Sequence, residues 1–316
     1  MNPANDTALS VTQFTITGFD HLSNQKLLGS LILITYIFVL LGSATNMSII
    51  VTSRHLHTPM YVLICNLAVV DIMFTTSAST TMISVLLAEI KTISYISCIS
   101  RMYVYHLGDM TECLALSLMA VDRMVAICLP LRYHSILTVP RVFVLIAFTW
   151  LIGMIAMAAM TATADNLPYC QPIIRYVFCD YAAVVRAACT DPEPSFLIST
   201  ILGAWFLAGQ FPFILLTYVK IVHTVVRMPN KESQAQMFKT CTTHVLVVAW
   251  YYTPKLITIL LTRIGVVLTV TERNAMVIVA TLIPSFLNPI IYCLRTREIR
   301  TQLLKVLSKL HVTPVK

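Results

Sequence analysis

Residues 119–133 read MAVDRMVAICLPLRY, and this stretch decides the fold. It begins apolar, places Asp122 directly before Arg123, continues apolar and stops at Pro130. Charged side chains at the end of a long apolar helix are costly in lipid, although less so near the interface than at mid-depth. Such a pair at the cytoplasmic mouth of a helical bundle is typical of a latch, which holds two helices together in one state and is exposed to a partner in another.

The composition of the whole chain also indicates a membrane protein. Of its 316 residues, 57% are hydrophobic and only 11% are charged, and the mean hydropathy is +0.79. A soluble domain carries about 25% charged residues, so much of this surface is expected to face lipid. Residues 1–26 are polar and lack the pattern of a cleavable signal peptide, so we expect the first membrane helix to serve as the insertion signal.

Seven apolar segments follow, each about long enough to span the roughly 30 Å of hydrocarbon in a bilayer. Only helices or closed barrels satisfy the backbone in lipid, and these runs are too long and too uniformly apolar for barrel strands. We therefore predict an all-α membrane protein with a seven-transmembrane helix bundle. The expected helices cover residues 27–51, 60–87, 96–128, 142–162, 195–226, 238–262 and 273–294.

The distribution of Lys and Arg predicts the orientation of the bundle. With the N-terminus outside, most basic residues lie on the cytoplasmic side, and Lys255 remains within the membrane. The formal charge of +8 then reflects this bias and an attraction to anionic membrane lipid, and nucleic-acid binding is not needed to explain it. We expect a multi-pass protein of the plasma membrane with an extracellular N-terminus.

The chain is expected to form one domain with two short flanking segments. Residues 1–26 are an extracellular tail, in which Asn5-Asp6-Thr7 is a glycosylation sequon, and residues 27–294 are the membrane bundle. Residues 295–316 are cytoplasmic. Their pattern, with Ile299, Leu303, Val306, Leu307 and Leu310 at helical spacing among basic residues, predicts a short amphipathic C-terminal helix on the inner leaflet.

Four of the nine cysteines are expected outside the cell, where disulfides persist. They are Cys98, Cys170, Cys179 and Cys189, and four cysteines allow three pairings, between which their positions alone do not choose. A zinc site is the competing interpretation. It is disfavoured because no His lies nearby in the sequence and the spacings are not of the C-x₂₋₄-C kind.

Several motifs resemble those of odorant receptors, a branch of the rhodopsin-like G-protein-coupled receptors. Residues 119–133 resemble the third-helix signature, with Met124 in place of the usual Tyr, which puts in doubt any role of a Tyr hydroxyl in the active state. The remaining motifs are LHTPMY at 56–61, KTCTTH at 239–244 with an altered start at 236–238, PSFLNPIIY at 284–292, and the segments 252–256 and 261–265, which are similar to a class I pattern associated with water-soluble odorants.

The resemblance implies a receptor that binds a small-molecule odorant and activates a heterotrimeric G protein of the stimulatory, cyclic-AMP-raising type. It also implies two disulfides, Cys98–Cys179 and Cys170–Cys189. A proline removes one backbone hydrogen bond, so a helix bends more easily there between two packings. The residues implied to switch in this way are Pro254, Asn288, Pro289 and Tyr292.

The candidate ligand residues lie on the third and sixth helices. Tyr105, His106 and Asp109 share a helix face because they are three and four residues apart. Lys255 follows Pro254, and a lysine at this depth should face protein or water. The resemblance implies that these residues, with Tyr252, face a shared ligand cavity. Three alternatives stay open: Lys255 and Asp109 bind a ligand carrying a carboxylate, with or without an amine; they pair with each other; or Lys255 snorkels along lipid.

Two acids lie in the middle of predicted helices. Related receptors hold a sodium ion beside the carboxylate at the position of Asp71, and Glu112 lies at mid-depth in the next helix. Two buried acids that lie close together do not both stay ionised without a cation. A bound sodium ion and a protonated, hydrogen-bonded acid are left as alternatives. No other cofactor is expected.

Other classes of function were weighed against the receptor. The chain has no nucleotide-binding glycine loop and no nucleophile–base arrangement, so we predict no catalysis. A transporter or channel is the main alternative, with Asp71, Asp109, Glu112 and Lys255 along an ion or proton path. The absence of an internal repeat in the hydropathy disfavours it. A non-olfactory chemoreceptor of the same fold is the remaining alternative.

Overall fold

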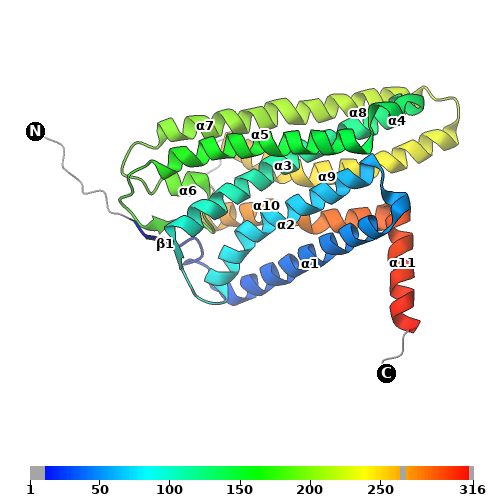
Figure 1. Ribbon diagram of the computed structural model, residues 1–316. Coiled ribbons are helices and arrows are strands. Elements are labelled where there is room, and N and C mark those ends of the chain that lie inside the picture. The colour runs from blue at the N-terminus through cyan, green and yellow to red at the C-terminus, as the bar shows by residue number, and fades with distance from the viewer. Residues whose placement is uncertain (1–10, 264–267, 313–316) are drawn as a thin grey trace, which may run out of the picture.

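The computed structural model of the protein describes residues 11–263 and 268–312. Its long helices run side by side, and the connecting segments gather at the two ends of the bundle (Figure 1). All seven predicted helices are present. They are α1 (Gln25–Thr52), α2 (Pro59–Leu86), α3 (Tyr95–Cys128), α5 (Val139–Asp165), α7 (Glu193–Ala204) continued through the π-helical segment η3 (Trp205–Gln210) into α8 (Phe211–Val226), α9 (Lys231–Arg263) and α10 (Val270–Arg295).

Most predicted boundaries agree with the structure within a few residues, and the start of the sixth span differs most. The apolar run begins near residue 238, but α9 begins at Lys231. Polar residues 231–237 continue the helix beyond the part that lipid would cover, and hydropathy does not detect such an extension. The predicted C-terminal helix is also present, as α11 (Arg297–Val312), which leaves the end of the bundle beside α10 (Figure 1).

Length and composition mark most of these helices as able to cross a membrane. Within the described residues, five spans qualify: α1, α2, α5, the continuous α7–α8 helix and α10. A sixth is α3 taken together with the turn η2 (Pro130–Arg132) and the short helix α4 (Tyr133–Ile136), which is bent by 112° against it. Helix α9 is not among the spans found in the described residues, but it packs against α3, α8 and α10 and completes the bundle.

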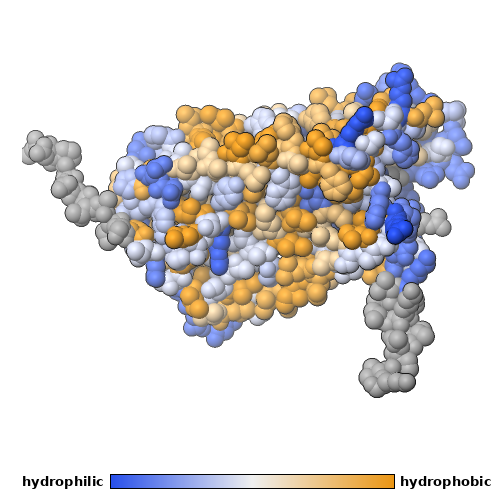
Figure 2. Space-filling view, viewed as in Figure 1, coloured by the Kyte–Doolittle hydropathy of each residue, from blue (hydrophilic) through white to orange (hydrophobic). Residues whose placement is uncertain are grey.

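The distribution of apolar and hydrophilic side chains also fits a helix bundle that crosses a membrane. Apolar side chains cover much of the middle of the molecule, and hydrophilic ones gather toward its two ends (Figure 2). Leu31, Phe148 and Leu216 are all more than half exposed, as expected of side chains that face lipid. Helix α3 lies at the centre, in contact with α2, α5, α8 and α9.

The outer end carries a small sheet that the all-α prediction did not include. Strand β1 (Gln13–Ile16) pairs antiparallel with β2 (Thr92–Ser94) and parallel with β3 (Ile173–Ile174). Phe14 and Ile16 of β1 are fully buried in the outer core. This part of the N-terminal segment therefore covers the bundle and is not a free polar tail. Asn5, the predicted glycosylation site, lies outside the described residues.

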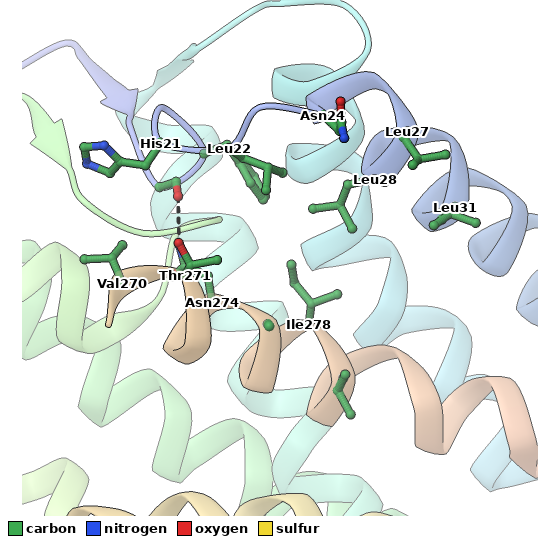
Figure 3. Close-up of a pocket in the computed structure, with 14 residues that line it drawn as sticks. His21, Leu22, Asn24, Leu27, Leu28, Leu31, Val270, Thr271, Asn274 and Ile278 are labelled. Carbon is green, nitrogen blue, oxygen red and sulfur yellow. Dashed lines mark hydrogen bonds between the residues drawn. The ribbon is translucent and has the colours of Figure 1, made fainter. Parts of the chain in front are cut away.

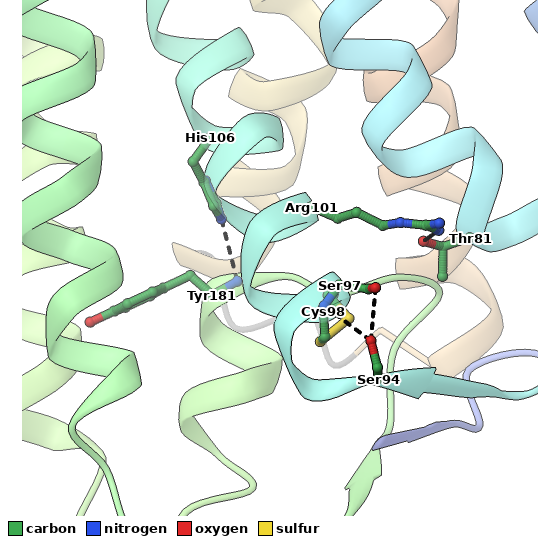
Figure 4. Close-up of a disulfide and its surroundings, with 8 residues drawn as sticks. Thr81, Ser94, Ser97, Cys98, Arg101, His106 and Tyr181 are labelled. Atoms are coloured by element: carbon green, nitrogen blue, oxygen red, sulfur yellow. Dashed lines mark hydrogen bonds between the residues drawn. A yellow bond between two sulfur atoms is a disulfide. The ribbon is translucent and has the colours of Figure 1, made fainter. Parts of the chain in front are cut away.

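Two disulfides hold the long outer loop. Cys98 at the top of α3 is bonded to Cys179, and Cys170 is bonded to Cys189 within the loop. Figure 4 shows the first of these beside the start of α3, where the Ser94 side chain caps the helix by accepting a hydrogen bond from the backbone N–H of Ser97. The pairing that the family resemblance implied is confirmed, and the zinc interpretation is wrong because all four sulfurs are bonded in pairs.

Candidate functional site

The predicted ligand residues of α3 share one face, but each has a different partner. Tyr105 lies 3.1 Å, hydroxyl to hydroxyl, from Thr281 of α10, and its ring stacks on Phe74 of α2. His106 turns toward the outer loop instead. One helix face therefore contacts two different walls of the bundle, and the sequence spacing alone did not show this divergence.

His106 joins α3 to the short loop helix α6 (Tyr181–Val185). Its Nε2 lies 3.3 Å from the backbone nitrogen of Tyr181, as Figure 4 shows, and 3.4 Å from Oδ1 of Asp180. Burial alone would raise the pKa of Asp180, but His106 and the backbone N–H groups at the start of α6 outweigh it and hold this pKa below its usual value. The disulfide-bonded loop is thus fixed to α3 by a second, polar contact.

Asp109 and Lys255 pair with each other across α3 and α9. The ammonium of Lys255 donates to Oδ1 of Asp109, and it also lies 3.4 Å from the centre of the Tyr251 ring. The Tyr251 hydroxyl donates to the backbone oxygen and to Oδ1 of Asp109, at 2.9 and 3.1 Å. The side chains of Lys255 and Asp109 keep 26% and 35% of their surface accessible. The structure therefore shows the internal pair, and Lys255 does not snorkel along lipid.

Tyr252 packs edge-on against the Tyr251 ring, with ring centres 4.9 Å apart, but it makes no described hydrogen bond to Asp109 or Lys255. Its hydroxyl lies 3.1 Å from Sγ of Cys113 on α3, its ring packs against Phe211 of α8, and it is 3% exposed. Consecutive helical residues point about 100° apart, so Tyr251, and not Tyr252, lies beside Asp109. Tyr251 stands in the same motif, directly before Tyr252, and the adjacent aromatic residues were the only sequence signal for it.

Buried oxygens gather at mid-depth between α2, α3 and α10. Asn288 donates through Nδ2 to both carboxylate oxygens of Asp71, at 3.0 and 3.1 Å. Both oxygens of Glu112 are buried without a described hydrogen-bond partner, as are Oγ of Ser285 and Oδ1 of Asn288. Glu112 lies within electrostatic reach of Asp71. Oxygen ligands of this kind fit a hard cation. No cluster of three or more His, Cys, Asp or Glu that could hold a metal occurs in the described part of the chain.

At the cytoplasmic end, Asp122 and Arg123 pair with each other. Nη2 of Arg123 lies 3.3 Å from Oδ2 of Asp122, and the hydroxyl of Tyr133 donates to Oδ1 of Asp122 at 2.7 Å. The described contacts of the latch thus join α3 to the short helix α4, and not to another long helix. Tyr133 is the last residue of the signature quoted above, and the sequence analysis gave it no role.

Arg123 also lines a cavity of about 670 Å³ at this end, between α2, α3, α9 and α10. Charged and polar side chains from several elements surround it, including Glu232, Lys239, His244 and Tyr292. The hydroxyl of Tyr292 points to Sδ of Met119 at 3.8 Å. Its volume lies within the range of roughly 300–1,000 Å³ that is typical of ligand pockets.

Comparisons with known proteins agree with this geometry. Residues 32–310 match the family model described as "Olfactory receptor". Olfactory receptor 10G4 of Homo sapiens is 32% identical over 306 residues, covering 95% of this chain and 96% of that relative. Olfactory receptor 10D1B of Mus musculus is 34% identical, covering 96% and 97%.

A solved structure confirms the fold. Squid rhodopsin superposes with a TM-score of 0.69 at 17% identity, covering 91% of this chain and 86% of that one. The narrower resemblance to class I receptors stays a prediction. The family model spans nearly the whole chain, and the relatives exceed 30% identity over 96–97% of their length. This chain therefore belongs to the olfactory receptor family, whose members are multi-pass membrane receptors that act through G proteins and are not enzymes.

Proposed function

We propose that this receptor binds a small polar or charged odorant in the outer half of its bundle, and that it couples to a stimulatory, cyclic-AMP-raising G protein. The Asp109–Lys255 pair carries the proposal. It is an ion pair between two spans, and about a quarter to a third of each side chain is still accessible. Ionisable groups inside a membrane are expensive and are therefore expected at functional sites.

A ligand carboxylate would replace Asp109 as the partner of Lys255. Asp109 would keep the hydrogen bonds from the Tyr251 hydroxyl, so it would not be left without a donor. A ligand that also carries an amine would satisfy Asp109 as well. The ligand shifts the receptor only if it binds the active arrangement better than the resting one. His106, which contacts the outer loop, and Tyr105, which contacts α10, would line the same region.

Helix α9 connects this pair to the cytoplasmic cavity. Lys255 and Pro254 lie in its outer half, and Lys239 and His244 line the cavity at its inner end. Pro254 lacks a backbone N–H, so α9 bends more easily there. Exchanging the partner of Lys255 would therefore move the inner end of α9 and reshape the surface that the G protein contacts.

Helix α10 is proposed as the second moving element. Its backbone carbonyl at Pro289 accepts a hydrogen bond from Nδ2 of Asn46 on α1 at 3.1 Å, and Asn288 binds Asp71. Tyr292 lies one turn further on, at the cytoplasmic cavity. We propose that a sodium ion binds among Asp71, Glu112, Ser285 and Asn288 in the resting state. The oxygens of Glu112, Ser285 and Asn288 that have no described partner would otherwise remain buried without compensation.

The proposed location is the plasma membrane with the N-terminus outside. Both disulfides lie at the end of the bundle that strand β1 covers, and disulfides persist in oxidising compartments. Glycosylation of Asn5 would follow from this orientation.

The deciding experiment is a cyclic-AMP assay in cells that express the receptor, against amino acids, carboxylic acids, amines and neutral odorants. We expect responses to carboxylate-bearing compounds, lost in Arg123→Ala and strongly reduced in Lys255→Gln at equal surface expression. A response limited to neutral compounds would remove the proposed role of Lys255. Responses that persist in Arg123→Ala would remove the proposed coupling role of Arg123.

A further inference from the structure

A second cavity lies away from the proposed odorant site, at the outer ends of α1 and α10. Its volume is about 390 Å³, within the range of roughly 300–1,000 Å³ typical of small-molecule sites. Leu28 of α1 and Ile278 of α10 face each other across it (Figure 3). Gly18 and Phe19, from the segment between β1 and α1, also line it.

Hydrogen bonds fix the segment around Gly18 and Phe19 that borders the cavity. The N–H of Gly18 donates to the carbonyl of Tyr176 at 3.1 Å, and Nε2 of Gln25 donates to the carbonyl of Phe19 at 2.9 Å. Nδ2 of Asn274 donates to the carbonyl of Gly18 at 2.7 Å, the bond drawn in Figure 3. The cavity is therefore a formed feature of the fold, because backbone groups on its rim are fixed by long-range hydrogen bonds.

Asn274, which lines this cavity, carries a buried polar atom that has no partner among the described residues. Asn274 is 6% exposed, and its Oδ1 is buried without a described hydrogen-bond partner. The amide orientation follows from the chemistry, because the Gly18 carbonyl only accepts and must face the NH₂ group. A buried acceptor without a donor costs free energy, so this position favours a ligand that brings an O–H or N–H group.

The remaining lining residues indicate that the rest of the ligand is apolar and uncharged. Leucine, isoleucine, valine and alanine side chains make up most of it, and none of the described residues that line it is Asp, Glu, Lys or Arg. Lys26, close by in sequence, pairs with Glu89 at the exposed surface, at 3.3 Å. A charged phospholipid headgroup would therefore find no counter-charge in the cavity, whereas a neutral alcohol needs none.

The cavity also opens toward lipid. Leu27, Leu31 and Val279 line it and are 61%, 54% and 47% exposed on helices that cross the membrane. Val279 lies nine residues beyond Val270, about 14 Å down the helix, which is close to the depth of one leaflet, about 15 Å. Its polar lining residues, His21, Asn24 and Thr271, lie at the outer end, where a headgroup would be.

We propose that this cavity binds a sterol-like membrane lipid, with its hydroxyl donating to Oδ1 of Asn274 and its apolar body lying between α1 and α10. The occupant enters from the outer leaflet, not from water. The bound lipid holds α10 against α1, and α10 carries Asn288, Pro289 and Tyr292 at its inner end. The site therefore lies on a helix that the proposed activation moves.

The test uses the full-length receptor in phosphatidylcholine nanodiscs with a photoreactive cholesterol whose hydroxyl is intact. We expect mass spectrometry to find cross-links in residues 27–31 and 270–279, competed by cholesterol. The methyl ether of cholesterol, which cannot donate, should compete about two- to tenfold more weakly, the loss expected for one hydrogen bond. This comparison avoids substituting Asn274, which also holds Gly18.

Matched variants locate the site. Ile278→Trp fills the cavity and should abolish these cross-links, as should Ala275→Phe if the first variant fails to fold. Ile155→Trp, on the lipid-exposed face of α5, should leave them unchanged. Labelling spread evenly over the spans and unchanged in both filling variants would overturn the site. Equal competition by cholesterol and its methyl ether would overturn the proposed hydrogen bond from the ligand hydroxyl to Asn274. The cavity would then bind apolar lipid without regard to a hydroxyl group.

Discussion

The Asp109–Lys255 pair raises the question of what its charges contribute to the folded receptor and to binding. Removing one partner of a fully buried ion pair costs roughly 3–5 kcal/mol, because the other charge stays uncompensated. These side chains are 26% and 35% accessible, so the cost here should be smaller. A double-mutant cycle separates that structural cost from a loss of ligand contact.

We expect Asp109→Asn and Lys255→Gln each to lower the melting temperature of the purified receptor, and the double variant to lose less than the sum of the two. The response to carboxylate odorants should not return in the double variant, because it lacks the cation that the ligand needs. Recovery of both stability and response would assign the pair a purely structural role.

Gly18 shows how tightly the outer segment is packed. A Cβ at this position would lie 2.3 Å from the backbone carbon and oxygen of Tyr176, and this carbonyl cannot move away without losing the hydrogen bond from the Gly18 N–H. Gly18→Ala should therefore destabilise the receptor by about 1–3 kcal/mol or more, as overpacking does, and lower its surface expression.

Gly203 in α7 provides the control for this change. Its added Cβ would meet nothing within 4 Å, and alanine favours a helix more than glycine does. Gly203→Ala should keep or slightly raise the melting temperature measured by thermal denaturation in detergent. Equal behaviour of the two variants would mean that the outer segment does not pack on the bundle as described.

At the scale of single residues, the sequence predicted which charged residues matter better than it predicted which residues contact them. Asp109, Lys255, Asp122 and Arg123 were found because charges inside apolar helices stand out. Their partners Tyr251 and Tyr133 were missed, because a tyrosine beside apolar residues is compatible with ordinary core packing. Asn274 carried no sequence signal at all, since its unpartnered oxygen follows only from the fold around Gly18.

At the scale of elements, the two disulfides close loops of different length and should therefore stabilise the fold to different extents. Cys98 and Cys179 are 81 residues apart, and Cys170 and Cys189 are 19 apart. Longer loops lose more entropy when they are closed, about 4.5 against about 3 kcal/mol in the chain-entropy model. Cys98 and Cys179 are also buried in the outer core.

Replacing Cys98 and Cys179 together by Ser should therefore reduce surface expression and melting temperature more than the paired replacement of Cys170 and Cys189. Flow cytometry with an extracellular tag and thermal denaturation measure the two effects. The opposite order would show that the loop's own bridge, not its attachment to α3, limits folding.

The helices were predictable and the sheet was not, for a physical reason. A span of about twenty apolar residues can be recognised locally in the sequence, and such a span satisfies its backbone hydrogen bonds in the bilayer by forming a helix. Strand β1 has four residues and pairs with segments near residues 93 and 173. Such pairing depends on contacts far apart in the chain, and the alternation around Phe14 and Ile16 was too short to indicate a strand.

For the whole molecule, we propose that the Asp122–Arg123 pair connects these elements to signalling. Asp122 is 2% exposed in its side chain and holds Arg123 at the edge of the cytoplasmic cavity. Asp122→Asn removes the charge that pairs with Arg123, and on the proposal this frees Arg123 from the resting arrangement. A hydrogen bond between charged groups contributes about 1.5–3 kcal/mol, and about 1.4 kcal/mol is a tenfold change in an equilibrium.

We therefore expect Asp122→Asn to raise basal cyclic AMP by about tenfold or more at equal surface expression, and the Arg123→Ala substitution to abolish this rise in the double variant. Tyr133→Phe is the matched control, because it removes the hydroxyl that binds Asp122 but leaves the charge pair. Its basal signal should stay close to that of the unmodified receptor. If Tyr133→Phe raised basal cyclic AMP as much as Asp122→Asn, the tie between α3 and α4, and not the charge on Asp122, would set the resting state.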